Sequence, residues 1–197
     1  MASIKEVALK TIDLEARAVA GLAPFINDDF EKAVNAIFSG KGRVVVSGIG
    51  KSAIIAHKIV ATFNSIFMHA ADAIHGDLGM VQQDDVVMVI SKSGESPEIK
   101  VLIPLLRNFG NTLIAMVGNT DSYLARNASI VLNTSVEQEA CPNNLAPTSS
   151  TTAQLVMGDA LAICLMELNG FQSGDFAKFH PGGTLGKKLY LRVSDLY

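Results

Sequence analysis

The stretch from Val86 to Glu98 constrains the fold more than any other part of this chain. It begins with five apolar residues, Val86–Ile90, and changes within one residue to serine, glycine and glutamate. A short β-branched run that ends in turn residues is typical of a buried strand in a parallel sheet. From Ser96 the pattern becomes helical, with Pro97 in a first turn, where proline is favoured. The stretch therefore predicts a strand–turn–helix unit.

Three hydroxyl groups, from Ser91, Ser93 and Ser96, follow the predicted strand. Hydroxyls and free N–H groups at a helix start can hold a phosphate, because the positive end of the helix dipole attracts the anion. Gly94 lets the backbone turn tightly without a Cβ clash. A carboxylate does not bind phosphate, so Glu98 is either a base for proton transfer or a first-turn acid favoured by the dipole. We interpret the stretch as a phosphate site with a base beside it.

Strands and helices alternate along the rest of the chain. Strands are expected at 43–47, 65–70, 85–90, 112–117 and 129–133. Helices are expected at 3–21, 28–38, 51–64, 96–109, 121–127 and, long and very apolar, at 153–169. Strands separated by helices predict a parallel sheet covered on both faces. A chain of 197 residues is long enough for one such α/β domain.

Composition narrows the possible functions. A formal net charge of −3 and the lack of tryptophan do not suit a nucleic-acid binder or a base-stacking surface. Residues 1–20 carry charges at helical intervals, so we expect neither a signal peptide nor a membrane anchor. The expected apolar runs are all shorter than a membrane-spanning helix. Cys141 and Cys164 have no metal-ligand spacing, so we expect a reduced, cytoplasmic protein. The charge and the short apolar runs predict neither membrane nor nucleic-acid partners.

A second strand-to-helix turn has the sequence Gly48-Ile49-Gly50-Lys51-Ser52. It is not a Walker A loop, because the position five residues before Gly50 is Val45 rather than glycine. It matches the dinucleotide-binding pattern, but a convincing acidic residue after the second strand is missing. The glycines either form only a tight turn, or they bring Lys51 and Ser52 to the sheet edge where open α/β folds bind ligands.

Hydroxyl groups gather again at Thr148–Thr152, before the long apolar helix. This run is either a hydroxyl-rich helix cap or a second wall of a site for a polyol or a phosphate. The sequence leaves both interpretations open.

The four histidines divide into two pairs. His57 lies in a predicted helix and His69 in a predicted strand, so we interpret both as structural. His75 and His180 lie in glycine-flanked loops, where a titratable ring is more often functional. His75 and Asp77 are also a weak candidate pair for a metal ion.

Five sequence blocks, in this order, resemble those of arabinose-5-phosphate isomerases, enzymes of the sugar isomerase (SIS) family. The blocks are Gly48-x-Gly50-Lys51-Ser52, His75-Gly76-Asp77-Leu78-Gly79-Met80, Ser91-x-Ser93-Gly94-Glu95-Ser96-x-Glu98, Ala146-Pro147-Thr148-Ser149-Ser150-Thr151-Thr152 and His180-Pro181-Gly182-Gly183. The serine block alone is typical of SIS domains in general, whereas the five blocks together are far more specific. The resemblance covers about 44–196.

The resemblance implies one SIS domain over 1–197, with a helical extension at 1–40 and a phosphosugar-binding core at 41–197. It implies a flavodoxin-like, five-stranded parallel sheet with helices on both faces. It also implies a homotetramer whose active sites draw residues from neighbouring subunits. The matching catalytic set is Lys51, His75, Glu98 and His180. The matching phosphosugar-binding loops contain Gly50, Ser52, Ser91, Lys92, Ser93, Gly94, Ser96, Thr148, Ser149, Ser150 and Thr151.

The implied reaction interconverts D-ribulose 5-phosphate and D-arabinose 5-phosphate through a cis-enediol(ate), at the start of the synthesis of Kdo, a sugar of lipopolysaccharide. Glu98 is the expected base, and Lys51 or a histidine the group that stabilises the enediolate oxygen. Neither a cofactor nor a metal is required, and His75 is a candidate position for an inhibitory metal. A pathway product is a possible inhibitor. The alternatives are a non-catalytic phosphosugar sensor and an isomerase of another phosphosugar.

Two features depart from the family pattern. Many members continue into a pair of regulatory CBS domains, and this sequence stops where those would begin, as either a natural short form or a piece of a longer chain would. Lys92 stands where the serine block often has asparagine or glutamine. It either adds positive charge near the phosphate or points to solvent, and we assign it no catalytic role.

Overall fold

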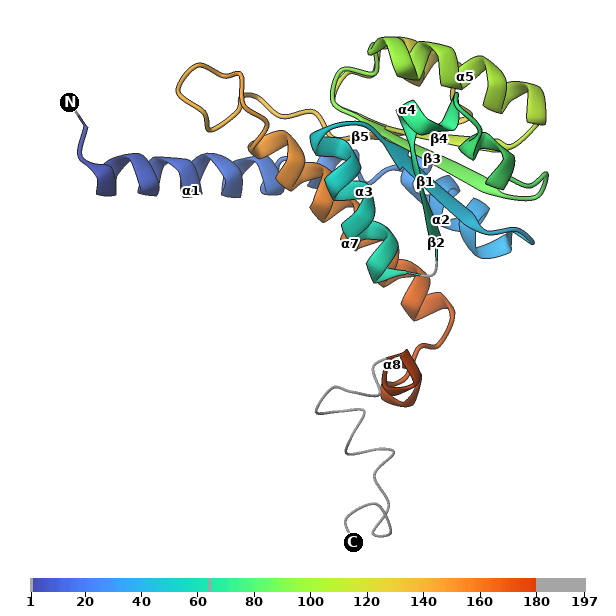
Figure 1. Ribbon diagram of the computed structural model, residues 1–197. Helices are drawn as coiled ribbons and strands as arrows, with labels where there is room; N and C mark the ends of the chain where they lie inside the picture. Colours follow the sequence, from blue (N-terminus) through green and yellow to red (C-terminus); the bar gives the residue numbers. More distant parts are fainter. Residues whose placement is uncertain (1, 64, 180–197) are drawn as a thin grey trace, which may run out of the picture. The chain divides into compact units, whose positions relative to one another are not determined.

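The computed structural model describes residues 2–63 and 65–179. Its strands are β1 (Val44–Gly48), β2 (Ser65–His69), β3 (Val86–Ser91), β4 (Thr112–Val117) and β5 (Ile130–Asn133). They form one sheet in the order β2-β1-β3-β4-β5, and each neighbouring pair is parallel (Figure 1). This is the flavodoxin-like strand order. The predicted fold class is confirmed.

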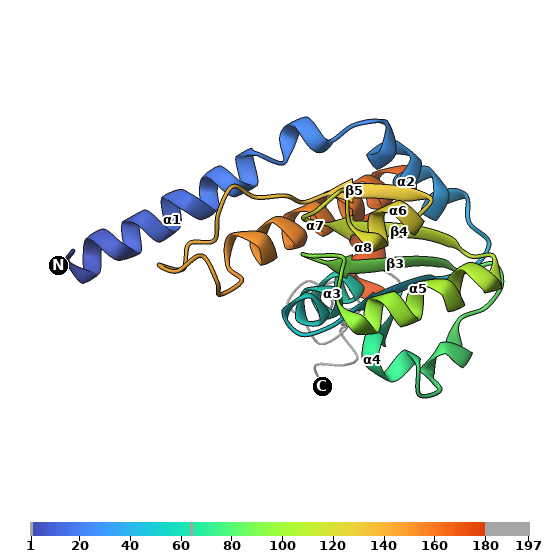
Figure 2. The ribbon, with the colours of Figure 1, turned by 90° about the horizontal axis from the view of Figure 1, so that it is seen from above.

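Helices cover both faces of the sheet (Figures 1 and 2). One face carries α4 (Ala70–Ala73), α5 (Pro97–Phe109) and α6 (Tyr123–Asn127), and the other carries α2 (Asp28–Ser39), α3 (Lys51–Thr62) and the first part of α7 (Ser149–Leu168). On the α5 side, Val87 and Val89 of the sheet pack with Ile99 and Leu102 of the helix. Every residue of β1 and β3 is buried, because side chains on both faces of these central strands meet helices.

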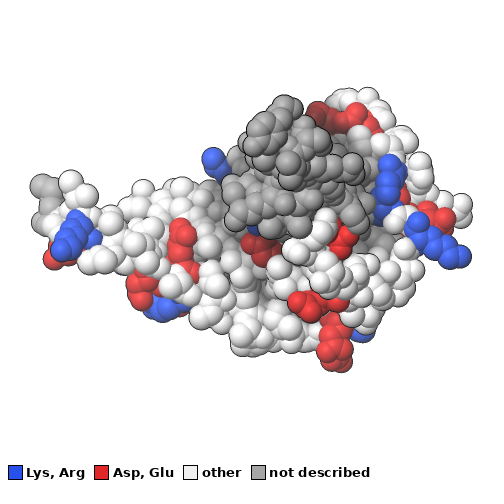
Figure 3. Space-filling view, turned by 90° about the horizontal axis from the view of Figure 1, so that it is seen from below, with Lys and Arg blue, Asp and Glu red and all other residues white. Residues whose placement is uncertain are grey.

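The helix α1 (Ile4–Ala20) confirms the amphipathic helix predicted before the sheet. The Ser3 hydroxyl accepts a hydrogen bond from the Glu6 N–H, and the Glu6 carboxylate accepts one from the Ser3 N–H, so the helix begins with a capping box. Leu14 is buried, whereas other large apolar side chains of α1 are exposed, namely Ile4, Val7, Leu9 and Ile12. Among the described residues on the face in Figure 3, uncharged side chains make up most of the surface and charged ones form small separate groups.

Several local elements differ from the sequence-based expectation. The segment expected to be a loop after β2 contains α4 and the 3-10 helix η2 (Asp77–Met80), and a 3-10 helix η1 (Ala23–Phe25) follows α1. The helix α7 begins at Ser149, four residues earlier than predicted. The hydroxyl run therefore lies largely inside its first two turns. A further helix, α8 (Ser173–Phe179), was not predicted.

The earlier start of α7 also changes one expectation about membranes. With 20 residues it is the one helix, within 2–63 and 65–179, that is long and apolar enough to cross a bilayer by length and composition alone. Its side chains Ala153, Met157 and Leu161 are nevertheless buried, and Asp159 forms an ion pair with Lys58 of α3. These contacts place one side of α7 against α3, which accounts for part of its apolar composition.

Contacts divide the chain into two compact units, Met1–Ala162 and Ile163–Tyr197. The division falls inside α7, and α8 belongs to the second unit. The sheet and the sites described below lie entirely in the first unit.

Buried Asp85 joins the start of β3 to that of β1. Its carboxylate accepts hydrogen bonds from the Arg43 N–H (2.8 Å), the Arg43 guanidinium (2.8 Å) and the Gln82 N–H (2.9 Å). Burial opposes its ionisation, but these hydrogen bonds lower its pKa overall. We expect Asp85→Asn to lower the free energy of unfolding by about 3 kcal/mol, because it removes the charge that these donors share. Urea unfolding would measure this against exposed Asp84→Asn, and equal losses in both variants would contradict the assignment.

Candidate active site

A cleft of about 300 Å³ lies where the carboxyl ends of β1 and β3 meet the first turns of α7. The strand order reverses between these two strands, since β2 lies beyond β1 while β4 and β5 lie beyond β3. Open α/β sheets bind ligands at this switch point. The cleft is lined by Ile49, Lys51, Ser52, Ser91, Lys92, Ser93, Ser96, Pro147, Ser150, Thr151 and Gln154.

The structure brings together three of the predicted blocks. Lys51 and Ser52 come from the start of α3, and Ser150 and Thr151 come from the first turn of α7. The loop between β3 and α5, residues 92–96, supplies most of the remaining hydroxyls. The result is a cleft with hydroxyl groups on several sides and two lysines at its edge.

Other predicted residues lie outside the cleft lining. Glu98 is half-buried in the first turn of α5, and His75 is exposed between α4 and η2. Thr148 and Ser149 adjoin the lining residue Ser150 in sequence. His180 falls outside the described residues.

The two predicted glycines shape the turns. Gly50 has φ +59° and Gly94 has φ +64°, a left-handed region that glycine enters without a Cβ penalty. Gly50 immediately precedes α3, and Gly94 lies between the hydroxyls of Ser93 and Ser96. Both turns therefore need glycine for conformational reasons, whatever they bind.

The loop after β3 is organised by its own hydroxyls. The Ser91 hydroxyl accepts a hydrogen bond from the Gly94 N–H (3.0 Å), and the Ser93 hydroxyl accepts one from the Glu95 N–H (3.3 Å). Within the described structure, the Ser96 hydroxyl is buried and has no hydrogen-bond partner. A buried hydroxyl without a partner is costly. The Ser96 hydroxyl is therefore a candidate ligand for a group that enters this cleft.

The two histidines interpreted as structural lie on the edge strand side. His57 of α3 stacks on Phe67 of β2, with ring centroids 3.7 Å apart. The His69 Nδ1 lies 3.3 Å from the Asp72 carboxylate, at the junction of β2 and α4. Neither residue lines the cleft.

Sequence reasoning missed Glu139, a fully buried carboxylate behind the cleft. Its Oε2 accepts hydrogen bonds from the Thr148 N–H (2.8 Å), the Thr148 hydroxyl (3.2 Å) and the Ser150 N–H (3.1 Å). Its Oε1 accepts the Ser150 hydroxyl and lies 2.7 Å from the Lys92 ammonium. The carboxylate thus caps the start of α7, which explains why the helix begins early. Glu139 lies in an irregular segment without a recognisable motif.

The pH dependence of the free energy of unfolding should report the ionisation of Glu139. Burial opposes its ionisation, but the Lys92 ammonium, the Ser150 hydroxyl and two backbone N–H groups lower its pKa from 4.5 to about 2. Because the pKa is lower in the folded state, the stabilisation is complete above about pH 4.5 and is lost as the pH falls toward 2. We expect this contribution to be about 3 kcal/mol.

Thermal unfolding between pH 7 and pH 2 would measure it. Glu139→Gln should unfold at a lower temperature at pH 7 and lose less stability on acidification than the unmodified protein does. Glu137→Gln, a change at an exposed neighbour, is the control. An acid dependence that Glu139→Gln leaves unchanged would show that another group is responsible.

Gln154 is a second residue that the sequence did not indicate. Its side-chain oxygen accepts a hydrogen bond from the Ser52 hydroxyl (3.2 Å), and both residues are buried at the cleft. This contact joins the start of α3 to the second turn of α7. It also directs the Ser52 hydroxyl toward α7.

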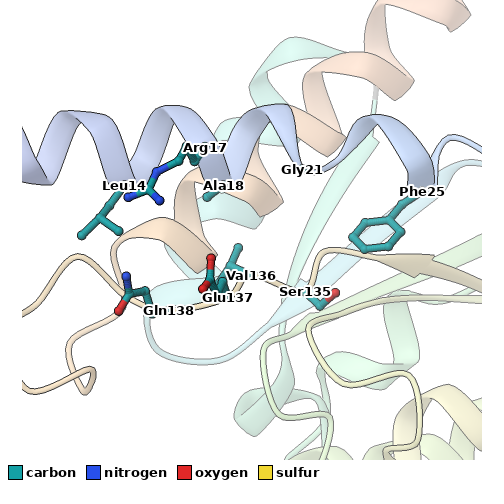
Figure 4. Close-up of a pocket in the computed structure, with 9 residues that line it drawn as sticks. All are labelled: Leu14, Arg17, Ala18, Gly21, Phe25, Ser135, Val136, Glu137 and Gln138. Carbon is teal, nitrogen blue, oxygen red and sulfur yellow. The ribbon is translucent and has the colours of Figure 1, made fainter.

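A larger groove, of about 380 Å³, lies between α1 and the segment after β5. Arg17 and Ala18 lie across it from Val136 and Glu137, and Phe25 lies near Ser135 at one end (Figure 4). Arg17 on its wall pairs with Asp13 of the same helix, 2.8 Å away. The groove lies away from the carboxyl ends of β1 and β3, where open α/β sheets bind ligands, so the cleft at the sheet edge is the better candidate for chemistry. In residues 2–63 and 65–179, no three His, Cys, Asp or Glu side chains gather in a metal-binding arrangement.

Comparisons with known proteins identify the family of this chain. The chain is 54% identical over 194 residues to arabinose 5-phosphate isomerase KdsD of Pseudomonas aeruginosa, and 50% identical over 192 residues to that of Escherichia coli K12. These alignments cover 96% and 95% of this chain, but 60% and 58% of the relatives. The chain therefore spans about 60% of the length of the curated relatives it matches.

A solved structure from E. coli CFT073, in complex with arabinose 5-phosphate, is 39% identical to this chain and superposes with a TM-score of 0.86. The alignment covers 92% of this chain and 100% of that one. The SIS domain pattern matches residues 37–164, which include the whole sheet and the cleft. The family match over most of the chain, together with the sheet order and the cleft at the switch point, shows that the chain belongs to the SIS domain family.

Proposed function

We propose that this chain is an aldose–ketose isomerase that interconverts D-arabinose 5-phosphate and D-ribulose 5-phosphate. The observation that carries the proposal is the cleft lined by serine and threonine hydroxyls with Lys51 and Lys92 at its edge. Such a site suits a small molecule with several hydroxyls and a phosphate. The relatives' name, arabinose 5-phosphate isomerase, supports the choice of this phosphosugar.

The start of α5 is the proposed phosphate site. The α7 start is already occupied, because its N–H groups at Thr148 and Ser150 donate to Glu139. The loop before α5 has the unpaired Ser96 hydroxyl and the positive end of a 13-residue helix. We therefore place the phosphate at residues 91–96, with the sugar extending toward α3 and α7.

Glu98 is the proposed base of the reaction. From open-chain arabinose 5-phosphate it would remove the C2 proton, and the electron pair would pass through a C1–C2 double bond to the carbonyl oxygen, giving a cis-enediolate. Lys51 or a histidine, His75 or His180, would stabilise that oxygen. The C2 hydroxyl proton then passes to the C1 oxygen, through Lys51 or a histidine, and Glu98 returns its proton to C1, which gives ribulose 5-phosphate. No nicotinamide or metal takes part in these steps.

A homotetramer with shared active sites is also part of the proposal. The large apolar side chains that α1 exposes, among them Ile4 and Ile12, support a subunit contact there. His75 lies outside the cleft lining of its own chain, which would suit contribution to a neighbouring site. Light scattering coupled to size-exclusion chromatography would give the number of subunits, and a monomer at micromolar concentration would contradict the proposal.

The proposed setting is the cytoplasm, at the start of the synthesis of Kdo for lipopolysaccharide. A later product of that route is a proposed inhibitor that binds in the same cleft. Titration of the isomerase with such a product would test the proposed inhibition. Unchanged activity at saturating product would refute it.

The decisive experiment is a discontinuous assay of the metal-free protein with D-arabinose 5-phosphate and detection of ribulose 5-phosphate. Glucose 6-phosphate and glucosamine 6-phosphate serve as comparison substrates. Turnover of the pentose phosphate alone would support the proposed reaction. Turnover of another phosphosugar would change the substrate, and binding without turnover would instead favour a phosphosugar sensor.

A further inference from the structure

Lys92 links two segments that are far apart in the sequence. It directly follows β3, and its ammonium lies 2.7 Å from Oε1 of Glu139. Its carbonyl accepts a hydrogen bond from the Gly118 N–H (3.1 Å) at the end of β4, so its backbone is held as well. The Lys92 side chain is 47% exposed, whereas that of Glu139 is 0% exposed. The lysine thus reaches from the cleft to a buried partner.

The Glu139 carboxylate has its acceptor positions filled. Oε1 receives the Lys92 ammonium and the Ser150 hydroxyl, and Oε2 receives two donors from Thr148 and one from Ser150. A carboxylate offers about four lone-pair positions, so these donors leave none for a substrate hydroxyl. Among the contacts of the described residues, Lys92 supplies the cationic donor and the others are neutral. Glu139 therefore stabilises the structure around the cleft and is not placed to act as a catalytic base.

We propose that Lys92 is a positioning residue that, by binding Glu139, holds the loop of residues 91–96 against the first turn of α7. The hydroxyls of the 91–96 loop then face the phosphate while those of α7 face the sugar of the same substrate. This inference rests on the proposed function for its effect on catalysis. It changes the expected role of Lys92 from a substrate ligand to a support of the cleft wall.

Loss of the Lys92 ammonium should make the Glu139 carboxylate more sensitive to acid. A buried carboxylate with neutral donors alone is more readily protonated, because burial disfavours its charged form. A second titratable group nearby is the Cys141 thiol, whose pKa is lowered overall by hydrogen bonds from the N–H groups of residues 146, 145 and 143, although burial and the Glu139 charge oppose this shift.

The first test is acid unfolding of the free protein, followed by circular dichroism. Lys92→Met should move the unfolding midpoint up by about one pH unit, whereas Lys92→Arg, which keeps the charge, should restore most of the original value. Lys100→Met is the matched control, since Lys100 forms an exposed pair with Glu95 (2.8 Å) whose loss should change the midpoint little. Equal midpoints for Lys92→Met and the unmodified protein would overturn the proposal.

The second test is the pH profile of the isomerase. Lys92→Met should lower kcat/KM on the order of tenfold to hundredfold, because the two walls no longer hold the substrate in one geometry. The acid limb of its profile should move to higher pH, and Lys92→Arg should recover both properties. A rise in KM with no change in acid unfolding would show instead that Lys92 binds the phosphate directly. Acid unfolding needs no substrate, so an inactive unmodified protein would refute the proposed function without deciding this inference.

Discussion

Glu98→Gln should lower kcat on the order of a thousandfold while leaving the affinity for the phosphosugar nearly unchanged. Glutamine has almost the same shape as glutamate but cannot accept the proton from carbon, and general base catalysis contributes about 100- to 10,000-fold. Glu98 lies in the first turn of α5, two residues beyond Ser96 of the proposed phosphate site. Removing the charge should therefore not disturb phosphate binding. Single-turnover kinetics and calorimetric titration would separate the two quantities.

Two further variants make this prediction specific. Glu98→Asp keeps a carboxylate but shortens the side chain, so it should retain more activity than Glu98→Gln. Glu137→Gln, far from the proposed base in sequence and exposed, should keep near-normal kcat. Near-normal turnover in Glu98→Gln would remove Glu98 from the role of base. The reaction would then need another base, and Lys51 or a histidine would be examined next.

Gly94→Ala should disrupt the proposed phosphate loop and lower the free energy of unfolding by about 3 kcal/mol. The residue has φ +64°, and an added Cβ would lie 2.2 Å from the Ser122 hydroxyl oxygen and 2.5 Å from the Ser122 Cβ. Gly94 also donates to the Ser91 hydroxyl and accepts from the Leu124 N–H (3.1 Å), so its displacement loosens the loop on both sides. Strain at a left-handed position and overpacking each cost about 1–3 kcal/mol.

Gly110→Ala separates these two costs. Gly110 has φ +78°, but no atom lies within 4 Å of the position its Cβ would take. It should therefore lose only about 1 kcal/mol, the cost of the left-handed conformation. Urea unfolding gives both values, and titration with inorganic phosphate tests whether Gly94→Ala alone loses anion binding. Equal effects of the two substitutions would mean that contact with Ser122 does not matter.

The fold followed from local patterns that a sequence carries by itself. The apolar runs at Val86–Ile90 and Thr112–Val117 predict buried parallel strands, because both faces of a central strand meet helices. The turns at Gly50 and Gly94 were predicted as tight strand-to-helix turns, and both have positive φ. Lys51, Ser52 and the serine loop could be assigned to one edge because parallel strands end together.

The parts that could not be predicted depend on contacts between segments distant in sequence. Glu139 belongs to no motif, and its burial follows from how the segment after β5 returns to Lys92 and Ser150. The helix α7 begins at Ser149, earlier than predicted, because the Glu139 carboxylate accepts hydrogen bonds from N–H groups at its start. A local sequence pattern does not show that these groups have a partner.

Hydrophobic periodicity, turn residues and sequence blocks thus determined the sheet, the family and the edge that carries the cleft. Only the tertiary structure decided which polar groups around that cleft lack a hydrogen-bond partner and which are already paired with one another. A hydrogen bond between side chains from distant segments depends on distances that no local pattern encodes. Ser96 with an unpaired hydroxyl and Lys92 already bound to Glu139 are the two clearest examples.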